Sequence, residues 1–179
     1  MLLRKKYWQV DRKTYVLGSG QPRRTGRGIV NVDLKPWAGV DIVHDLEETP
    51  WPIQDGAAMH CNATHVAEHI RNFSGFMDEC HRILSPGGSL FMEVPNARNA
   101  DMAFADPTHV RFFTKHTFIN YMTIEGVHRH GIFQHAWCLL HLEETDKVIR
   151  VHLAPVPDEY RTAESIELWK KYKHEDSHG

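Results

Sequence analysis

The sequence of 179 residues lacks several features that mark specialised classes of protein. No apolar run approaches the length of a membrane span, and no apolar signal-peptide segment stands at the N-terminus. The formal net charge is only −2, so there is no general electrostatic attraction toward nucleic acid. The three cysteines lie far apart and form no C-x-x-C pair, which excludes a disulfide framework and suits a reducing cytoplasm.

The chain also has no internal repeat and no low-complexity linker. Its length predicts a single domain over residues 1–179, and a hydrophobic content of 41% is enough for an ordinary core. Basic clusters at 4–6 and 23–24 are expected to be solvated surface rather than phosphate-binding patches.

Two short apolar segments near the N-terminus lie unusually close together. Residues 15–20 read as a strand that runs into glycines, and residues 29–33 as a strand that ends in Asp33. An α/β nucleotide site begins in this way, because glycines let the backbone approach a ligand and the acid can accept hydrogen bonds from ribose hydroxyls. Only Gln21 to Gly28 separate the strands, and one proline and two glycines among them leave little room for a crossover helix.

The rest of the chain continues the α/β pattern. Further strands are expected at 40–44, 57–62 and 89–94, and an antiparallel hairpin from 133–142 and 147–153. Helices are expected over 66–84, with a possible break at 72–75, over 115–124, and from 158 in a polar segment. The sequence therefore predicts a Rossmann-like open sheet of about seven strands, mostly parallel, with an antiparallel C-terminal hairpin and a shortened first crossover. Ligands of such sheets bind outside the carboxyl ends of the strands.

Six short motifs occur in a fixed order over roughly residues 14–124. They are Leu17-Gly-Ser-Gly20, Asn31-Val-Asp33, His44-Asp-Leu46, Pro50-Trp-Pro52, His65-Val-Ala-Glu-His69 and Arg82-Ile-Leu-Ser-Pro-Gly-Gly88. This ordered set resembles class I S-adenosylmethionine-dependent methyltransferases, and most closely their small type-11-like group with a shortened first crossover. The last two motifs are the most specific part of the resemblance, whereas the glycine motif alone is weak.

The resemblance implies S-adenosylmethionine as the cofactor and a row of cofactor-binding residues at successive strand ends. These are Gly18, Ser19 and Gly20 along the methionine, Asp33 at the ribose hydroxyls, Leu34, Asp45 and Leu46 at the adenine, and Thr64 and His65 near the sulfonium. Two simpler interpretations stay open, in which Asp33 is only a strand-end turn residue and Asp45 only caps the next turn. The chain departs from the family pattern at Ala57 and Ala58, where an acid is usual, and in the few residues before its first strand.

A methyl acceptor is expected near the segment 106–113, which follows the fifth strand. A histidine titrates near neutral pH, so His109 can act as the base for a hydroxyl acceptor, and Arg111 can hold an anionic acceptor. His65 is the third candidate for a catalytic role, because the resemblance places it beside the reacting sulfonium. The alternative for His109 is a structural one, in which its hydrogen bonds tie the loop down with Asp106 as partner.

Other interpretations compete with these. Residues 65–69 also spell H-x-x-E-H, an inverted zinc-peptidase signature in which His65 and His69 share one helix face and Glu68 is the base, with Glu143 or Glu144 as a third ligand. We favour instead that Glu68 and His69 pair with nearby backbone or with Arg82, and no metal is predicted. A histidine-rich segment over 128–135 is expected to be surface, and Trp37 can approach the adenine.

The sequence thus predicts a cytoplasmic methyltransferase that transfers a methyl group in line to a small-molecule or carbohydrate acceptor. Nucleic acid and membranes are not expected partners. A homodimer is one way to cover the open cofactor site, and the loop over 96–113 is another. The alternative function is a methyltransferase-like binding domain that keeps the cofactor site without activity.

Overall fold

A computed structural model describes residues 13–21 and 24–157. The basic cluster at 4–6, Arg23 of the second cluster and the polar helix predicted from 158 lie outside these described residues. In the described part, seven strands form one sheet in the order β3-β2-β1-β4-β5-β7-β6. Their bounds are β1 Lys13–Leu17, β2 Ile29–Asp33, β3 Ile42–Val43, β4 Ala58–Thr64, β5 Leu84–Pro95, β6 Trp137–Glu144 and β7 Val148–Pro155.

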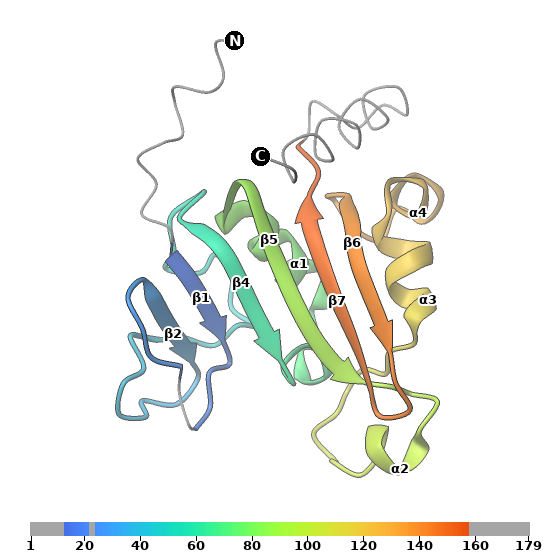
Figure 1. Ribbon diagram of the computed structural model, residues 1–179, viewed down its shortest axis with the longest axis horizontal. Helices are drawn as coiled ribbons and strands as arrows, with labels where there is room; N and C mark the ends of the chain where they lie inside the picture. Colours follow the sequence, from blue (N-terminus) through green and yellow to red (C-terminus); the bar gives the residue numbers. More distant parts are fainter. Residues whose placement is uncertain (1–12, 22–23, 158–179) are drawn as a thin grey trace.

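The pairing of the strands confirms the predicted fold class. β3, β2, β1, β4 and β5 pair in parallel, whereas β7 is antiparallel to both β5 and β6. Across the short first crossover, β1 and β2 pair from Thr14 with Ile29 to Leu17 with Val32, and the Thr14 N–H donates to the Gly28 carbonyl at 2.8 Å. The carboxyl ends of the five parallel strands therefore meet at one edge of the sheet, at the bottom of Figure 1.

The described helices are short apart from α1. They are η2 Ala67–His69, α1 Phe73–Ile83, α2 Ala100–Ala103, α3 Lys115–Thr117, η3 Phe118–Met122 and α4 Ile124–His130. The helix predicted over 66–84 begins later, because Asn72 caps α1 by accepting from the Gly75 N–H. The helix predicted over 115–124 is a series of three pieces that continues to His130 and ends at Gly131, which has φ +60°.

The connection between β3 and β4 is attached to α1 by one arginine. Arg82 donates to both carboxylate oxygens of Glu79 at 2.8 and 2.7 Å, to Asp55 at 2.7 Å and to the carbonyl of Ile53 at 2.7 Å. The same Glu79 accepts from the backbone N–H of the buried Trp51 at 2.6 Å. The predicted alternative that Arg82 pairs with Glu68 or His69 is therefore wrong, because these contacts occupy its guanidinium.

Candidate functional site

The glycine turn after β1 has two residues in the left-handed region, Gly18 with φ +59° and Gly20 with φ +57°. A Cβ at Gly18 would lie 2.5 Å from Cγ2 of Val66, whereas a Cβ at Gly20 would meet nothing within 4 Å. The Ser19 N–H donates to the Val32 carbonyl at 3.0 Å, which joins the turn to β2. Gly18 thus lets the turn pack on the segment after β4, and Gly20 borders open space.

These two glycines predict different costs of substitution. Both alanine variants suffer the strain of a left-handed backbone, about 1–2 kcal/mol. Gly18→Ala adds an overlap with a buried side chain, so we expect it to lower the free energy of unfolding by roughly 3 kcal/mol, and Gly20→Ala by about 1 kcal/mol. Urea denaturation of both variants measures the difference. Equal losses would contradict the close packing of Gly18 on Val66, and the double variant with Val66→Ala should recover part of the Gly18→Ala loss.

Asp33 at the end of β2 holds the glycine turn in place. Its Oδ2 accepts from the Gly20 N–H at 2.8 Å and its Oδ1 from the Lys35 N–H at 2.9 Å. The residue is only 9% exposed, so its carboxylate has a fixed orientation. A carboxylate has about four acceptor positions, and these two bonds leave one on each oxygen for a ligand.

The residues predicted for the adenine follow β2 and β3. Leu34 is 59% exposed and Trp37 41%, with the Lys35 ammonium 5.5 Å from the Trp37 ring centroid, so apolar surface is available beside Asp33. Asp45 accepts from the Glu47 N–H at 2.9 Å, which is the turn cap named as its alternative. Leu46 is buried in the core, and its carbonyl accepts from the Trp51 indole.

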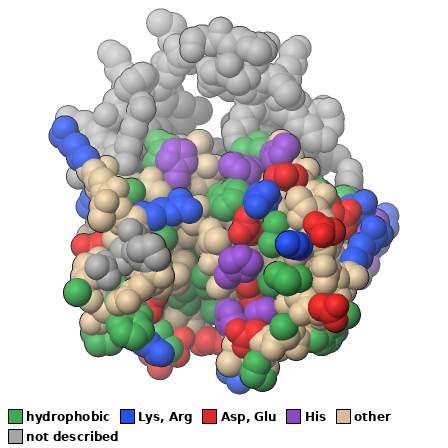
Figure 2. Space-filling view, turned by 60° about the horizontal axis from the view of Figure 1, so that its bottom comes forward, with side chains coloured by type: hydrophobic (Ala, Val, Ile, Leu, Met, Phe, Trp, Pro, Cys, Tyr) green, Lys and Arg blue, Asp and Glu red, His purple; other side chains and the backbone are tan. Residues whose placement is uncertain are grey.

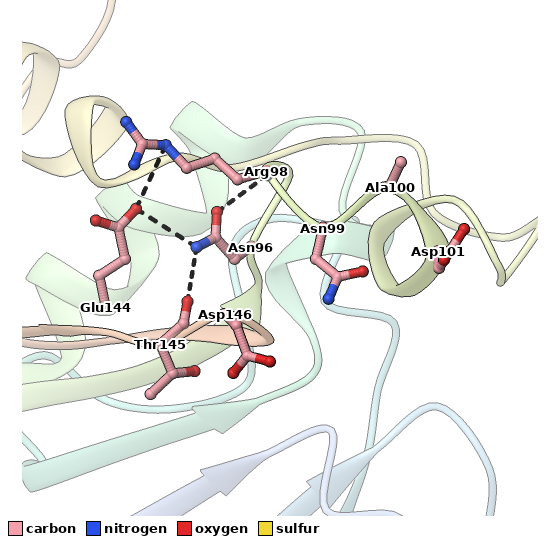
Figure 3. A pocket seen from close by; sticks show the side chains of 8 residues that line it. All are labelled: Asn96, Arg98, Asn99, Ala100, Asp101, Glu144, Thr145 and Asp146. Atoms are coloured by element: carbon pink, nitrogen blue, oxygen red, sulfur yellow. Dashed lines mark hydrogen bonds and ion pairs between the residues drawn. The ribbon is translucent and has the colours of Figure 1, made fainter.

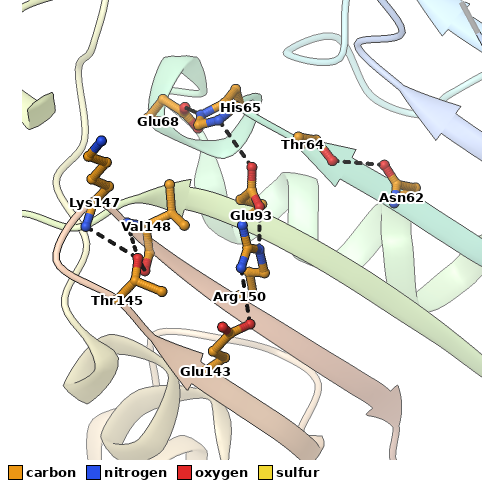
Figure 4. A network of polar contacts seen from close by, with 10 residues as sticks. All are labelled: Asn62, Thr64, His65, Glu68, Glu93, Glu143, Thr145, Lys147, Val148 and Arg150. Atoms are coloured by element: carbon orange, nitrogen blue, oxygen red, sulfur yellow. Dashed lines mark hydrogen bonds and ion pairs between the residues drawn. The ribbon is translucent and has the colours of Figure 1, made fainter.

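His65 follows directly after β4 in a polar network that reaches across the sheet (Figure 4). It is the one non-glycine residue with positive φ, +55°, among the described residues. Its Nδ1 lies 3.1 Å from Oε1 of Glu68 and its Nε2 lies 3.2 Å from Oε1 of Glu93. The other carboxylate oxygen of Glu93, Oε2, accepts from Nε of Arg150 at 2.5 Å. The hydrogen bond to Glu68 raises the pKa of His65 and the two acidic charges add to this effect, while partial burial opposes it.

This arrangement lacks what the zinc-peptidase alternative requires. His65 stands before the three-residue helix η2 rather than on a longer helix shared with His69. Both ring nitrogens of His65 contact carboxylates, so neither is free to bind zinc. The neighbouring Thr64, also predicted near the sulfonium, donates to Asn62 at 3.0 Å. The sequence did not predict the parts played by Glu93 and Arg150. Their only indication in the sequence is that each is a charged residue within a strand, and the two strands, β5 and β7, pair with each other.

The 106–113 segment packs against the residues after β4. The backbone N–H groups of Val110 and Arg111 donate to the Glu68 carbonyl at 2.9 and 3.1 Å. Nη2 of Arg111 donates to the Arg71 carbonyl at 2.7 Å and its guanidinium lies 5.3 Å from the Phe73 ring centroid, so the side chain fastens the loop to the start of α1. Its role toward an anionic acceptor stays a prediction.

His109 also has a structural contact. Its Nδ1 lies 2.7 Å from the Ala103 carbonyl, and its backbone N–H donates to the Asp106 carbonyl at 3.1 Å. The predicted ring partner Asp106 instead accepts from the Thr108 N–H and hydroxyl, so the side-chain pairing with His109 is wrong. The ring of His109 meets the ring of His69, with centroids 4.9 Å apart.

An open polar cavity of about 580 Å³ lies at the end of β5 (Figure 3). Asn96, the first residue after β5, donates to the Thr145 carbonyl at 2.8 Å, and Lys115 contacts Glu144 at 2.9 Å. The hydrogen bond and charge of Lys115 lower the pKa of Glu144. Residues that line the cavity include Asn96, Arg98, Asn99, Asp101, Glu144 and Asp146. The sequence predicted no cavity here, because its residues come from segments about fifty positions apart.

All these groups belong to the edge at which the parallel strands end. Figure 2 turns this edge toward the reader, and histidine side chains cross the middle of the view with acidic side chains beside them. The structure thus brings Gly20 and Asp33 into contact on one side and gathers His65, Glu68 and His109 on the other. Among the described residues, no helix combines the length and apolar character that crossing a bilayer requires.

Comparisons with known proteins give the family of the chain. A family model described as a methyltransferase domain matches residues 27–128, which is more than half of the sequence. Among curated proteins, none matches the chain.

Several solved structures share the fold. A SAM-dependent methyltransferase from Aquifex aeolicus is 13% identical with a TM-score of 0.57, and 82% of this chain and 83% of that chain are covered. The Burkholderia thailandensis 1,6-didemethyltoxoflavin-N1-methyltransferase with bound 1,6-didemethyltoxoflavin and S-adenosylhomocysteine is 12% identical, with a TM-score of 0.55 and coverage of 82% and 72%. A variant of the Catenulisporales acidiphilia 16S rRNA (adenine(1408)-N(1))-methyltransferase is 14% identical, with a TM-score of 0.55 and coverage of 83% and 86%. From the family match and this shared fold, the chain belongs to the methyltransferase-domain family.

Proposed function

We propose that this protein is a methyltransferase that uses S-adenosylmethionine. The observation that carries the proposal is the junction of Asp33 with the glycine turn, through the 2.8 Å bond from the Gly20 N–H. The junction presents an oriented carboxylate beside open space, which suits the two hydroxyls of a ribose. S-adenosylmethionine has no phosphate, so its binding does not need the helix N-terminus that the short first crossover lacks.

We assign different residues to the ribose, the adenine and the methionine of this cofactor. Asp33 accepts the ribose hydroxyls, Leu34 and Trp37 offer apolar surface to the adenine, and the turn over 18–20 lines the methionine. Ser19 supports this placement, because its hydroxyl is buried and has no hydrogen-bond partner among the described residues. When bound, S-adenosylmethionine supplies an electrophilic methyl group, and the chain must align the acceptor with it and exclude water.

The acceptor side is proposed to lie between the end of β4 and the 106–113 segment. His65, clamped between Glu68 and Glu93, borders this side, and Nε2 of His109 is available to take a proton from an acceptor hydroxyl. We propose a small-molecule or carbohydrate acceptor, because the charge of the chain is balanced and does not favour nucleic acid. Among the structural relatives, one is named for a small molecule and one for 16S rRNA, so acceptor screening should include both classes. The cytoplasm and a homodimer stay predictions.

Titration of the full chain with S-adenosylhomocysteine tests the cofactor proposal. We expect one binding site by calorimetry and a rise in melting temperature that grows with ligand concentration. Absence of both heat and stabilisation at millimolar ligand would overturn the proposal. Binding without turnover of any acceptor in a broad screen would favour the inactive binding domain instead.

Replacing His109 distinguishes a role in binding the cofactor from a role in methyl transfer. We expect His109→Ala to keep the affinity for S-adenosylhomocysteine within about twofold, because its ring contacts Ala103 and His69 rather than the glycine turn. Turnover, once an acceptor is known, should fall by about 100-fold, the usual effect of losing a group that handles the acceptor proton. Unchanged turnover would refute a direct role and leave His109 as a residue that ties down the loop.

A further inference from the structure

Three side chains at the acceptor side form a cluster of metal-binding type. Glu68 and His69 both lie in η2, and His109 comes from the 106–113 segment. One donor atom of each lies within 4.8 Å of those of the other two. Two imidazoles and one carboxylate are a common ligand set for a divalent transition metal, with further positions open to water or substrate.

Glu68 contributes a buried carboxylate oxygen that can accept a cation or a hydrogen-bond donor. Its side chain is 1% exposed, and Oε1 contacts Nδ1 of His65 at 3.1 Å. The other oxygen, Oε2, is buried and has no hydrogen-bond partner in the part of the chain that the structure describes. A buried carboxylate oxygen without a partner is costly, so an unfilled position of this kind points to a ligand that satisfies it.

Both histidines are held in the way that metal-binding histidines are held. Nδ1 of His109 lies 2.7 Å from the Ala103 carbonyl, which can only accept, so in the neutral ring Nδ1 is the donor and the lone pair is on Nε2. Nδ1 of His69 contacts Thr108 at both its carbonyl, 3.3 Å, and its hydroxyl, 3.0 Å. Asp106 in turn accepts from the Thr108 hydroxyl at 2.6 Å. Such outer contacts select the tautomer and orient the ring of a ligating histidine.

We propose that Glu68, His69 and His109 bind one divalent first-row transition metal ion of the zinc type. Two nitrogen ligands disfavour magnesium and calcium, which prefer oxygen. Ligand atoms around tetrahedral zinc are about 3.3 Å apart, so binding draws the three side chains closer by small rotations. Metal binding does not rest on the proposed methyl transfer. With the metal bound, Nε2 of His109 is a ligand and cannot take the acceptor proton, so the proton-acceptor role proposed above applies to the metal-free protein.

The test uses the full chain, stripped of metal by dialysis against a chelator and titrated with Zn²⁺ by calorimetry and with Co²⁺ by visible absorption. We expect one site of micromolar affinity or tighter. Glu68→Gln, His69→Ala and His109→Ala should each weaken it by about 100-fold or more, and Thr108→Val by about tenfold through loss of its hydroxyl contact to His69. His116→Ala is the matched control, because His116 is exposed and lies outside the cluster.

The control matters because the chain has 14 histidines that can bind zinc weakly. A wild type without a site tighter than about 100 µM would overturn the proposal, as would equal weakening by His116→Ala. Glu68→Gln conserves shape, and circular dichroism checks the fold of each variant. If Glu68→Gln does not fold, the variants His69→Ala and His109→Ala test the proposal, because both of these side chains are partly exposed. Asp33→Ala should keep the metal affinity and lose S-adenosylhomocysteine binding, so failure of the metal site and failure of the cofactor site are told apart.

Discussion

Replacing Asp33 by alanine is expected to raise the dissociation constant for S-adenosylhomocysteine by about 100-fold or more, because each hydrogen bond to a charged group contributes roughly 1.5–3 kcal/mol. The carboxylate is already oriented by the Gly20 and Lys35 N–H groups, so a ribose finds its acceptors in place. The variant loses the two ligand bonds and also the bond that holds Gly20. Calorimetry at pH 7 measures the change.

Two further variants make this measurement specific. Asp33→Asn keeps the shape and one acceptor oxygen but loses the charge, so its affinity should lie between those of the wild type and Asp33→Ala. Glu48→Ala removes an exposed carboxylate near the same edge and should bind as the wild type does. Affinity of Asp33→Ala within twofold of the wild type would refute the ribose role and leave Asp33 as a turn residue.

Replacing Arg82 by methionine is expected to lower the free energy of unfolding by about 3 kcal/mol, near the low end for a broken buried ion pair. The Arg82 side chain is 26% exposed, which places the expected cost at that end, whereas Glu79 is only 10% exposed. The variant leaves the Glu79 carboxylate without its cation and two carbonyls, of Trp51 and Ile53, without their donor. Urea denaturation at pH 7 measures the loss.

A surface arginine is the matched control for this variant. Arg98 is 62% exposed and 3.8 Å from Glu144, so Arg98→Met should cost less than about 0.5 kcal/mol. Adding Glu79→Gln to Arg82→Met should recover part of the loss, because no unpaired buried charge then remains. A cost for Arg82→Met no greater than that of Arg98→Met would contradict a structural role for this network.

The ion pair of Glu79 with Arg82 predicts how the stability of the protein depends on pH. Burial raises the pKa of Glu79, but the hydrogen bonds from Arg82 and Trp51 and the charge of Arg82 outweigh burial, so the pKa is lowered. The stabilisation by this carboxylate is therefore present above its unfolded pKa, about 4.3, and is lost as the pH falls through the folded pKa. The difference between the wild type and Arg82→Met should shrink as the pH is lowered below about 4.

The fold class and the parallel strands that end at one edge of the sheet could be predicted from short stretches of sequence. Alternating and continuous apolar runs indicate strands, and Gly18, Gly20 and Asp33 follow their strands directly. Element boundaries were predicted less well. Val66 and Ile70 fit the apolar period of a long helix, yet they are buried on either side of the three-residue helix η2, because the backbone turns at His65 and α1 begins only at Phe73.

By itself, the sequence determined the fold class, the glycine turn and the acid at the end of β2, because each depends on residues close together in the chain. Tertiary structure alone decided the partners of the polar side chains. It placed His65 between Glu68 and Glu93, gave the ring of His109 the Ala103 carbonyl instead of Asp106, and left Oε2 of Glu68 buried beside two histidines. The physical reason is that a hydrogen bond depends on distance and direction in space, which spacing along a chain does not encode for residues from different strands and loops.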